Sequence, residues 1–125
     1  MANNKKKILL IEDDQAISIM YKGKLESDGF SVLTAINGAD GLALAKKEGP
    51  DLIMLDIILP QLDGFSVLAE LKNDPKTKGI PVIMLTNLGT DEDKAKGEKM
   101  GAQDYFIKAN LTPGQIGEKI KKYLR

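Results

Sequence analysis

Side chains suited to phosphoryl chemistry follow four of the five apolar, strand-like runs in this sequence. They comprise three carboxylates, one hydroxyl and one ammonium group: Glu12, Asp13, Asp56, Thr86 and Lys108. In an open parallel α/β sheet, the carboxyl ends of the strands form the edge that binds ligands. The assumption of one parallel sheet therefore brings all five side chains to a single edge.

Three carboxylates at one edge repel one another, and a divalent cation relieves that repulsion. Oxygen ligands suit a hard cation such as Mg²⁺. A carboxylate fixed at the end of a buried strand, as expected for Asp56, can attack phosphorus to form an acyl phosphate. Thr86 and Lys108 would then supply a hydroxyl donor and a positive charge to the phosphoryl oxygens. This hypothesis treats the five residues as one site.

Each of these residues also has a simpler interpretation when taken alone. Glu12 and Asp13 are also typical first-turn acids of a helix. Asp56 could be an ordinary loop residue, Thr86 the end of a strand, and Lys108 an exposed lysine. Their shared position after neighbouring strands favours the common site.

The elements that must position these residues alternate between strand and helix along the chain. Apolar runs predict strands near residues 7–11, 30–35, 52–55, 82–85 and 105–107. Helices are expected between and after them, with caps at Asp14, Asp63, Thr90 and Thr112. The pattern predicts an α/β fold of the flavodoxin-like kind, a doubly wound five-stranded parallel sheet of order 2-1-3-4-5 in a three-layer α/β/α sandwich.

Two helices differ in the strength of their apolar pattern. The first predicted helix has Ile17, Met20, Tyr21 and Leu25 on one face, which is expected to be buried. The helix after Thr90 is poor in apolar residues, so we expect it to be held loosely.

Composition limits the function further. The chain has 125 residues and fits one domain, 1–125, with residues 1–6 expected to form a flexible basic arm. Lys and Arg equal Asp and Glu at 18 each, so no net charge favours nucleic acid or an anionic membrane. The absence of Cys and His excludes disulfides, zinc–cysteine sites and Ser–His–Asp catalysis. With no long apolar segment or signal peptide, a cytoplasmic location is expected.

Taken in order, the motifs resemble the response-regulator receiver domain of two-component signalling. The matching pieces are KILLIEDD at 7–14, DLIMLD at 51–56 with Pro60 and Asp63-Gly64 after it, PVIMLT at 81–86, and the segment 101–108. Each piece is weak alone, but their order and spacing are specific and cover essentially the whole chain.

The resemblance implies a role for each residue at the predicted edge. Asp56 would accept a phosphoryl group from the phosphohistidine of a partner kinase, and Thr86 and Lys108 would bind its oxygens. Mg²⁺ would be held by Glu12, Asp13, Asp56 and the backbone carbonyl of Ile58. Thr86 and Tyr105 would couple phosphorylation to the face made by the fourth helix, the fifth strand and the fifth helix.

The resemblance also implies a phosphorylation-dependent signalling switch rather than an enzyme that turns over an external substrate. Its own chemistry would be Mg²⁺-dependent phosphoryl transfer and slow autodephosphorylation. The expected partners are a sensor histidine kinase or phosphotransfer protein and a downstream protein target, without direct contact to nucleic acid or membrane. A monomer or a phosphorylation-dependent dimer is expected.

Three features depart from the pattern of that family. Ala109 stands where a proline usually follows the lysine, which predicts either a trans bond with a shifted Lys108 or a strained cis bond. Ile58 and Leu88 occupy positions that tune dephosphorylation, and apolar side chains there predict a long-lived phosphoform unless they only pack on neighbours. The chain ends at Arg125 without an output domain, so it is either a stand-alone receiver or a domain of a longer protein.

Three rival functions fit the sequence less well. Enzymes of the haloacid dehalogenase type need a second acid two residues after the nucleophile, where this chain has Ile58, and their acidic pair comes last rather than first. A flavodoxin-like cofactor binder needs a Gly-rich phosphate loop after the first strand, and this sequence has no such loop there. A degenerate receiver that only binds partners is disfavoured because all five expected groups are present.

Overall fold

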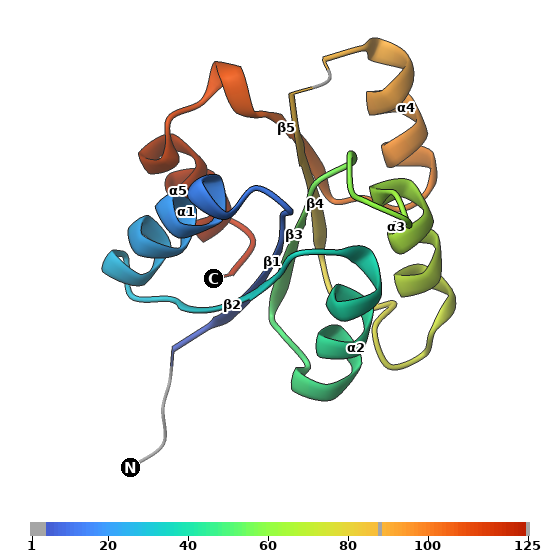
Figure 1. Cartoon of the computed structure of the whole chain (residues 1–125), viewed down its shortest axis with the longest axis horizontal. Coiled ribbons are helices and arrows are strands. Elements are labelled where there is room, and N and C mark those ends of the chain that lie inside the picture. The colour runs from blue at the N-terminus through green and yellow to red at the C-terminus, as the bar shows by residue number, and fades with distance from the viewer. Residues whose placement is uncertain (1–4, 88, 125) are drawn as a thin grey trace.

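The structure is a computed structural model that describes residues 5–87 and 89–124. Five parallel strands form one sheet in the order β2-β1-β3-β4-β5, which confirms the predicted flavodoxin-like topology (Figure 1). The strands are β1 (Lys7–Ile11), β2 (Ser31–Ala35), β3 (Leu52–Leu55), β4 (Val82–Thr86) and β5 (Asp104–Ile107). The helices are α1 (Gln15–Ser27), α2 (Gly38–Glu48), α3 (Gly64–Asn73), α4 (Asp91–Lys99) and α5 (Pro113–Lys121), with a short 3₁₀ helix η1 (Lys108–Asn110) after β5.

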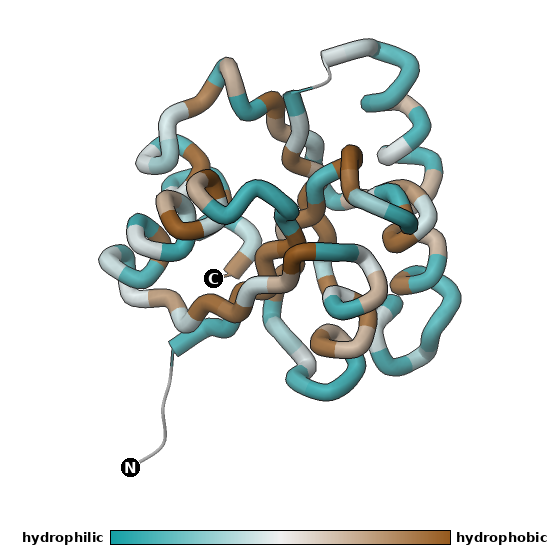
Figure 2. Tube along the Cα trace, viewed as in Figure 1, coloured by the Kyte–Doolittle hydropathy of each residue, from teal (hydrophilic) through white to brown (hydrophobic). Residues whose placement is uncertain are grey.

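Helices cover both faces of the sheet. In Figure 1, α1 and α5 lie on one side, and α2, α3 and α4 lie on the other. The three inner strands β1, β3 and β4 are apolar almost throughout and nearly all buried, as expected for strands packed on both faces. Figure 2 shows the hydrophobic residues gathered along these strands, with hydrophilic residues on the outer helices. The sheet therefore separates two apolar cores, one under each helical layer.

Four predicted helix caps are confirmed by hydrogen bonds. The cap side chains Asp14, Asp63, Thr90 and Thr112 each accept from the backbone N–H three residues later, at 3.0 to 3.1 Å. Gln115 completes a capping box, because its side chain accepts from the backbone N–H of Thr112 at 2.8 Å. These caps fix where the helices begin relative to the strand ends.

The buried face of α1 differs from the sequence-based prediction. Met20 was expected to be buried but is 47% exposed, whereas Ser18, Tyr21 and Leu25 are buried. These three positions lie on one side of a 3.6-residue helix, and Met20 points away from that side. The predicted face is confirmed at Tyr21 and Leu25 and is wrong at Met20.

The weak apolar pattern of α4 has a structural counterpart. Gly97 is the only buried residue within Asp91–Lys99. A Cβ on Gly97 would lie 3.6 Å from the Met84 side chain and 3.7 Å from the Tyr105 ring, so the α4 backbone packs directly on β4 and β5. The Lys96 ammonium also lies 4.4 Å from the centre of the Phe65 ring. Loose attachment of α4 stays a prediction.

Two remaining predictions concern the basic arm at residues 1–6 and the absence of a long apolar segment. Within the expected basic arm, residues 1–4 lie outside the described residues, and the Lys6 carbonyl accepts a hydrogen bond from Ser31 at 2.9 Å. Of the helices that the structure describes, none combines the length and apolar character needed to cross a bilayer.

Candidate functional site

A pocket of about 240 Å³ opens at the carboxyl ends of the strands, at the edge that the sequence predicted. All five predicted side chains line it. They are joined by four further residues, so the full lining is Glu12, Asp13, Asp14, Ile17, Asp56, Ile58, Thr86, Asn87 and Lys108. The topology therefore brings together residues that are up to 96 positions apart in the sequence.

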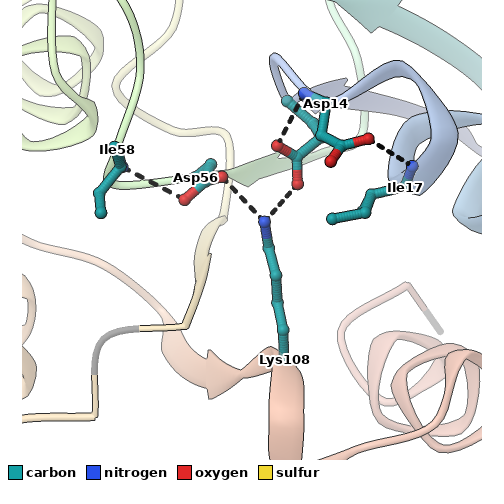
Figure 3. A network of polar contacts seen from close by, with 6 residues as sticks. Asp14, Ile17, Asp56, Ile58 and Lys108 are labelled. Carbon is teal, nitrogen blue, oxygen red and sulfur yellow. Dashed lines mark hydrogen bonds and ion pairs between the residues drawn. The ribbon is translucent and has the colours of Figure 1, made fainter.

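Lys108 lies between two carboxylates that line this pocket with it (Figure 3). Its ammonium forms an ion pair with Asp56 Oδ2 at 2.8 Å and a second ion pair with Glu12 Oε1. The three side chains are 8%, 8% and 2% exposed, respectively. Two buried acids that follow different strands thus share one cation.

The bond between Lys108 and Ala109 is trans, so the alternative of a strained cis bond is wrong. Lys108 begins the 3₁₀ helix η1, in which its carbonyl accepts from Leu111 N–H at 3.4 Å. This turn lets the chain leave β5 while the ammonium stays within hydrogen-bonding distance of Asp56. The structure therefore has the trans alternative, and a shift of Lys108 relative to the family stays a prediction.

Burial makes Glu12 an unusually weak acid. Its side chain is nearly inaccessible, and its Oε2 accepts from the backbone N–H of Asp14 at 3.3 Å. Desolvation raises the pKa of Glu12 to about 7; the hydrogen bond from Lys108 opposes this rise, and neighbouring Asp56 adds to it. Burial also lowers the pKa of Lys108, but its bonds to Asp56 and Glu12 outweigh burial and leave that pKa above its ordinary value.

The backbone around Asp56 holds its carboxylate in place. The Asp56 N–H donates to the Ile11 carbonyl at 3.1 Å, and its Oδ1 accepts from Ile58 N–H at 3.2 Å. Gly64 packs against this backbone so closely that a Cβ there would lie 2.2 Å from the Asp56 carbonyl oxygen. This contact explains why a glycine follows the cap Asp63 in the sequence.

Glu12, Asp13 and Asp56 form a group that fits a metal ion. Each offers a carboxylate oxygen, and these three oxygens lie within 4.8 Å of one another. The donor set consists of hard anionic oxygens, which suit a hard divalent cation. Ile58 lines the same pocket, and its carbonyl as a further ligand stays a prediction.

The two predicted switch residues are both buried. Thr86 is the last residue of β4 and is fully buried, and Tyr105 on β5 is 8% exposed. Tyr105 pairs with Met84 across the β4–β5 ladder and belongs to the core under α2, α3 and α4. The Tyr105 ring is therefore turned toward the core.

Of the two residues predicted to tune dephosphorylation, the structure describes Ile58. Ile58 is 59% exposed at the rim of the pocket. Leu88 lies outside the described residues. Sequence reasoning missed three other lining residues, Asp14, Ile17 and Asn87. Asn87 directly follows Thr86, so its position after a strand was an available signal. Asp14 was predicted only as a helix cap, and Ile17 only as part of the buried face of α1.

Comparison with known proteins identifies the fold and the family. A family model described as the response regulator receiver domain matches residues 8–121. The DNA-binding dual master transcriptional regulator RpaA of Synechocystis is 49% identical over 102 residues, covering 82% of this chain and 42% of that protein. Protein PilH of Pseudomonas aeruginosa is 40% identical over 102 residues, covering 82% of this chain and 84% of PilH.

Solved structures agree with these sequence matches. The chemotaxis protein CheY4 of Vibrio cholerae superposes with a TM-score of 0.89 at 28% identity, covering 95% of this chain and 98% of that one. A Mn²⁺-bound form of the response regulator Rcp1 gives a TM-score of 0.83 at 28% identity, covering 95% and 94%. Receiver domains bind a divalent metal at an acidic pocket, in keeping with the group formed by Glu12, Asp13 and Asp56.

The matches cover nearly all of this chain but only part of its longer relatives. This chain spans about half the length, or less, of the first curated relatives that it matches. The matched part is the phosphorylation-dependent signalling module, which is not a turnover enzyme, and it covers nearly all of this sequence. The chain belongs to the response regulator receiver domain family.

Proposed function

We propose that this protein is a signalling switch in which Asp56 accepts a phosphoryl group from a partner phosphohistidine. The observation that carries this proposal is the buried Asp56 carboxylate, held 2.8 Å from the Lys108 ammonium in an acidic pocket that both residues line. Asp56 is the nucleophile, because its oxygens reach the pocket while its backbone is fixed to β1 and α3.

Phosphoryl transfer here forms one bond and breaks another. An Asp56 oxygen bonds to phosphorus, the phosphorus–nitrogen bond of phosphohistidine breaks, and the neutral imidazole leaves with a proton from solvent. Lys108 and Thr86 contact the phosphoryl oxygens, which need positioning and charge neutralisation more than acid–base groups. Glu12, Asp13, Asp56 and the Ile58 carbonyl would hold Mg²⁺, which supplies further neutralisation of those oxygens when bound.

The signal leaves the site through Thr86 and Tyr105. Both lie on the neighbouring strands β4 and β5, and Tyr105 packs near Gly97 of α4. A phosphoryl group that engages Thr86 therefore acts on the two strands that α4 rests on. The face made by α4, β5 and α5 is the surface that a downstream protein reads.

The partners of this switch are proteins. One is a sensor kinase or phosphotransfer protein, and the other is the downstream target. The relative RpaA is named as DNA-binding, but the matched part covers only 42% of that protein. The equal numbers of acidic and basic residues in this chain support protein partners rather than direct contact with nucleic acid.

One sheet with two cores supports the prediction that the chain forms a single domain.

A small-molecule phosphodonor tests the proposal directly. We expect the protein incubated with Mg²⁺ and acetyl phosphate to gain one phosphoryl group by intact-mass spectrometry. Hydroxylamine should remove that group, because it cleaves acyl phosphates. Chelation of Mg²⁺ should prevent its formation. If no phosphoform appears with Mg²⁺ present, Asp56 is not the acceptor, although the fold is unaffected.

The metal ligands can be separated from a neighbouring acid. We expect Asp13→Asn to weaken Mg²⁺ binding by about tenfold or more in isothermal titration calorimetry, because one of three anionic ligands is lost. Asp14→Asn is the matched control. Asp14 lines the same pocket but its Oδ1 accepts from Ile17 N–H at 3.1 Å, a cap that asparagine also provides. Equal weakening by both variants would contradict the assignment of Asp13 as a ligand.

Ile58 is expected to protect the phosphoform from water. Its apolar side chain stands at the pocket rim and cannot orient a water molecule by hydrogen bonding. We therefore expect Ile58→Asn to shorten the half-life of the phosphoform by on the order of tenfold, measured after removal of the phosphodonor. Ile19→Asn is the control, since Ile19 is also exposed, at 71%, but lies outside the pocket. An unchanged half-life in Ile58→Asn argues against this role.

A further inference from the structure

The outer face of α2 has an apolar centre between two opposite charges. We call it the α2 face and define it by Ile36, Asp40, Ala43, Leu44 and Lys47. Together with Thr34 and Ala35 of the edge strand β2, these residues line a hollow of about 420 Å³. This hollow is separate from the acidic pocket, and nothing in the proposed switch uses it.

The α2 face is open to solvent. Ile36 is 50% exposed, and Ala43 is exposed beside half-buried Leu44. In Figure 1, α2 lies at the end of its helical layer, next to the edge strand β2 and away from α4. An apolar surface at an unpaired sheet edge is a typical site for protein contact.

The two charges on this face have no ion-pair partners among residues 5–87 and 89–124. Asp40 lies in the first turn of α2 and accepts only from its cap Asn37, whose Nδ2 donates to Asp40 Oδ2 at 3.1 Å. Lys47 lies in the last turn. The adjacent Lys46 differs, since it reaches Asp74 near the end of α3 at 3.5 Å. Asp40 and Lys47 are therefore available for contacts with another molecule.

The order of these residues makes the face complementary to itself. If two α2 helices pack antiparallel about a two-fold axis, positions equally far from the midpoint between Ala43 and Leu44 face each other. Asp40 then faces Lys47 of the second copy, and Ala43 faces Leu44 of the second copy. Both charge and side-chain size are matched by one symmetry operation. The aliphatic stem of Lys47 can also cover the exposed Ile36 of the other copy.

We infer that the α2 face binds a second copy of this chain in an isologous, antiparallel dimer. The contact does not require phosphorylation, because it involves neither the acidic pocket nor the face of α4, β5 and α5. Exposed ion pairs contribute little energy each, so the dimer is weak and forms at high protein concentration. Its specificity comes from the pairing of unlike charges.

Sedimentation equilibrium of the full chain, from about 10 μM to about 1 mM, tests this dimer. We expect a mass that rises with concentration from one chain toward two. Asp40→Lys and Lys47→Asp should each raise the dissociation constant by about tenfold or more, because each turns two attractions into two repulsions. An equimolar mixture of the two variants should associate again, since the first then presents two lysines to two aspartates of the second.

Matched controls on α4 distinguish this interface from others. Asp93 and Lys99 occupy the same places in α4, first turn and last turn, that Asp40 and Lys47 occupy in α2. Asp93→Lys and Lys99→Asp should leave the dimer unchanged. The inference is overturned if the natural chain stays monomeric at about 1 mM. It is equally overturned if the α2 variants dimerise normally, if their mixture fails to associate, or if only the α4 variants dissociate the dimer.

Discussion

Asp56→Asn is expected to abolish the phosphoform completely while the protein stays folded. An amide has nearly the same shape as a carboxylate, but it is not a nucleophile toward phosphorus. The asparagine oxygen can still accept from Ile58 N–H, which Asp56 Oδ1 accepts at 3.2 Å. Lys108 keeps its ion pair with Glu12 in the variant. The loss of phosphorylation is therefore a loss of chemistry, and far-UV circular dichroism should show an unchanged fold.

Asp63→Asn provides the matched control for this variant. Asp63 lies at the end of the same loop, after β3, and its Oδ1 accepts from Ser66 N–H at 3.0 Å as the cap of α3. Asparagine caps a helix about as well as aspartate, so this variant should be phosphorylated normally. A hydroxylamine-labile phosphoform of normal yield in Asp56→Asn would place the acceptor on another residue.

The fold and much of the site could be predicted because the inner strands are buried on both faces. A strand such as Leu52–Leu55 is fully buried and carries no polar residue, so the first polar residue after it, Asp56, marks the strand end. Parallel strand order then brings Asp56, Glu12 and Lys108 together without any knowledge of contacts. The same reasoning located Thr86 at the end of β4.

The sequence could not predict that two adjacent acids would differ in burial. Glu12 is buried and Asp13 is exposed, although they are neighbours of similar chemistry. The direction in which the chain leaves β1 decides this difference, and Glu12 N–H is fixed to the Ala35 carbonyl at 2.9 Å. The path of the chain after Lys108 was equally unpredictable, because it depends on the turn that η1 forms after β5. Such details depend on backbone geometry rather than on residue type.

Lys108→Ala is expected to damage both stability and chemistry. In the metal-free protein, its removal leaves the buried carboxylates of Glu12 and Asp56 without a counter-charge. Breaking a buried ion pair in this way costs about 3–5 kcal/mol of unfolding free energy. The rate of phosphorylation by acetyl phosphate should fall by about 10²–10³-fold, because a donor to the transferring group is lost. Chemical denaturation in a chelator and mass spectrometry measure the two effects.

The stability loss in Lys108→Ala should depend on pH. Burial already raises the pKa of Glu12 to about 7 with Lys108 present, and loss of the lysine raises that pKa further. A carboxyl whose folded-state pKa lies above its unfolded value stabilises the fold while protonated, and this contribution is lost as the pH rises. Near pH 6 the variant can protonate Glu12 and relieve the repulsion. At pH 8 relief by protonation is weaker, so we expect the larger stability loss there.

Lys72→Ala separates this electrostatic effect from simple loss of a lysine. Lys72 is also partly buried, but its Nζ donates to backbone carbonyls, those of Lys78 at 3.2 Å and Ile80 at 3.1 Å. Its removal should lower stability equally at pH 6 and pH 8, and Mg²⁺ should not restore it. In Lys108→Ala, Mg²⁺ binds to carboxylates that lack a counter-charge and should recover more stability than it adds to the natural protein. If Lys108→Ala loses the same stability at both pH values and gains nothing extra from Mg²⁺, the lysine does not neutralise the acidic site.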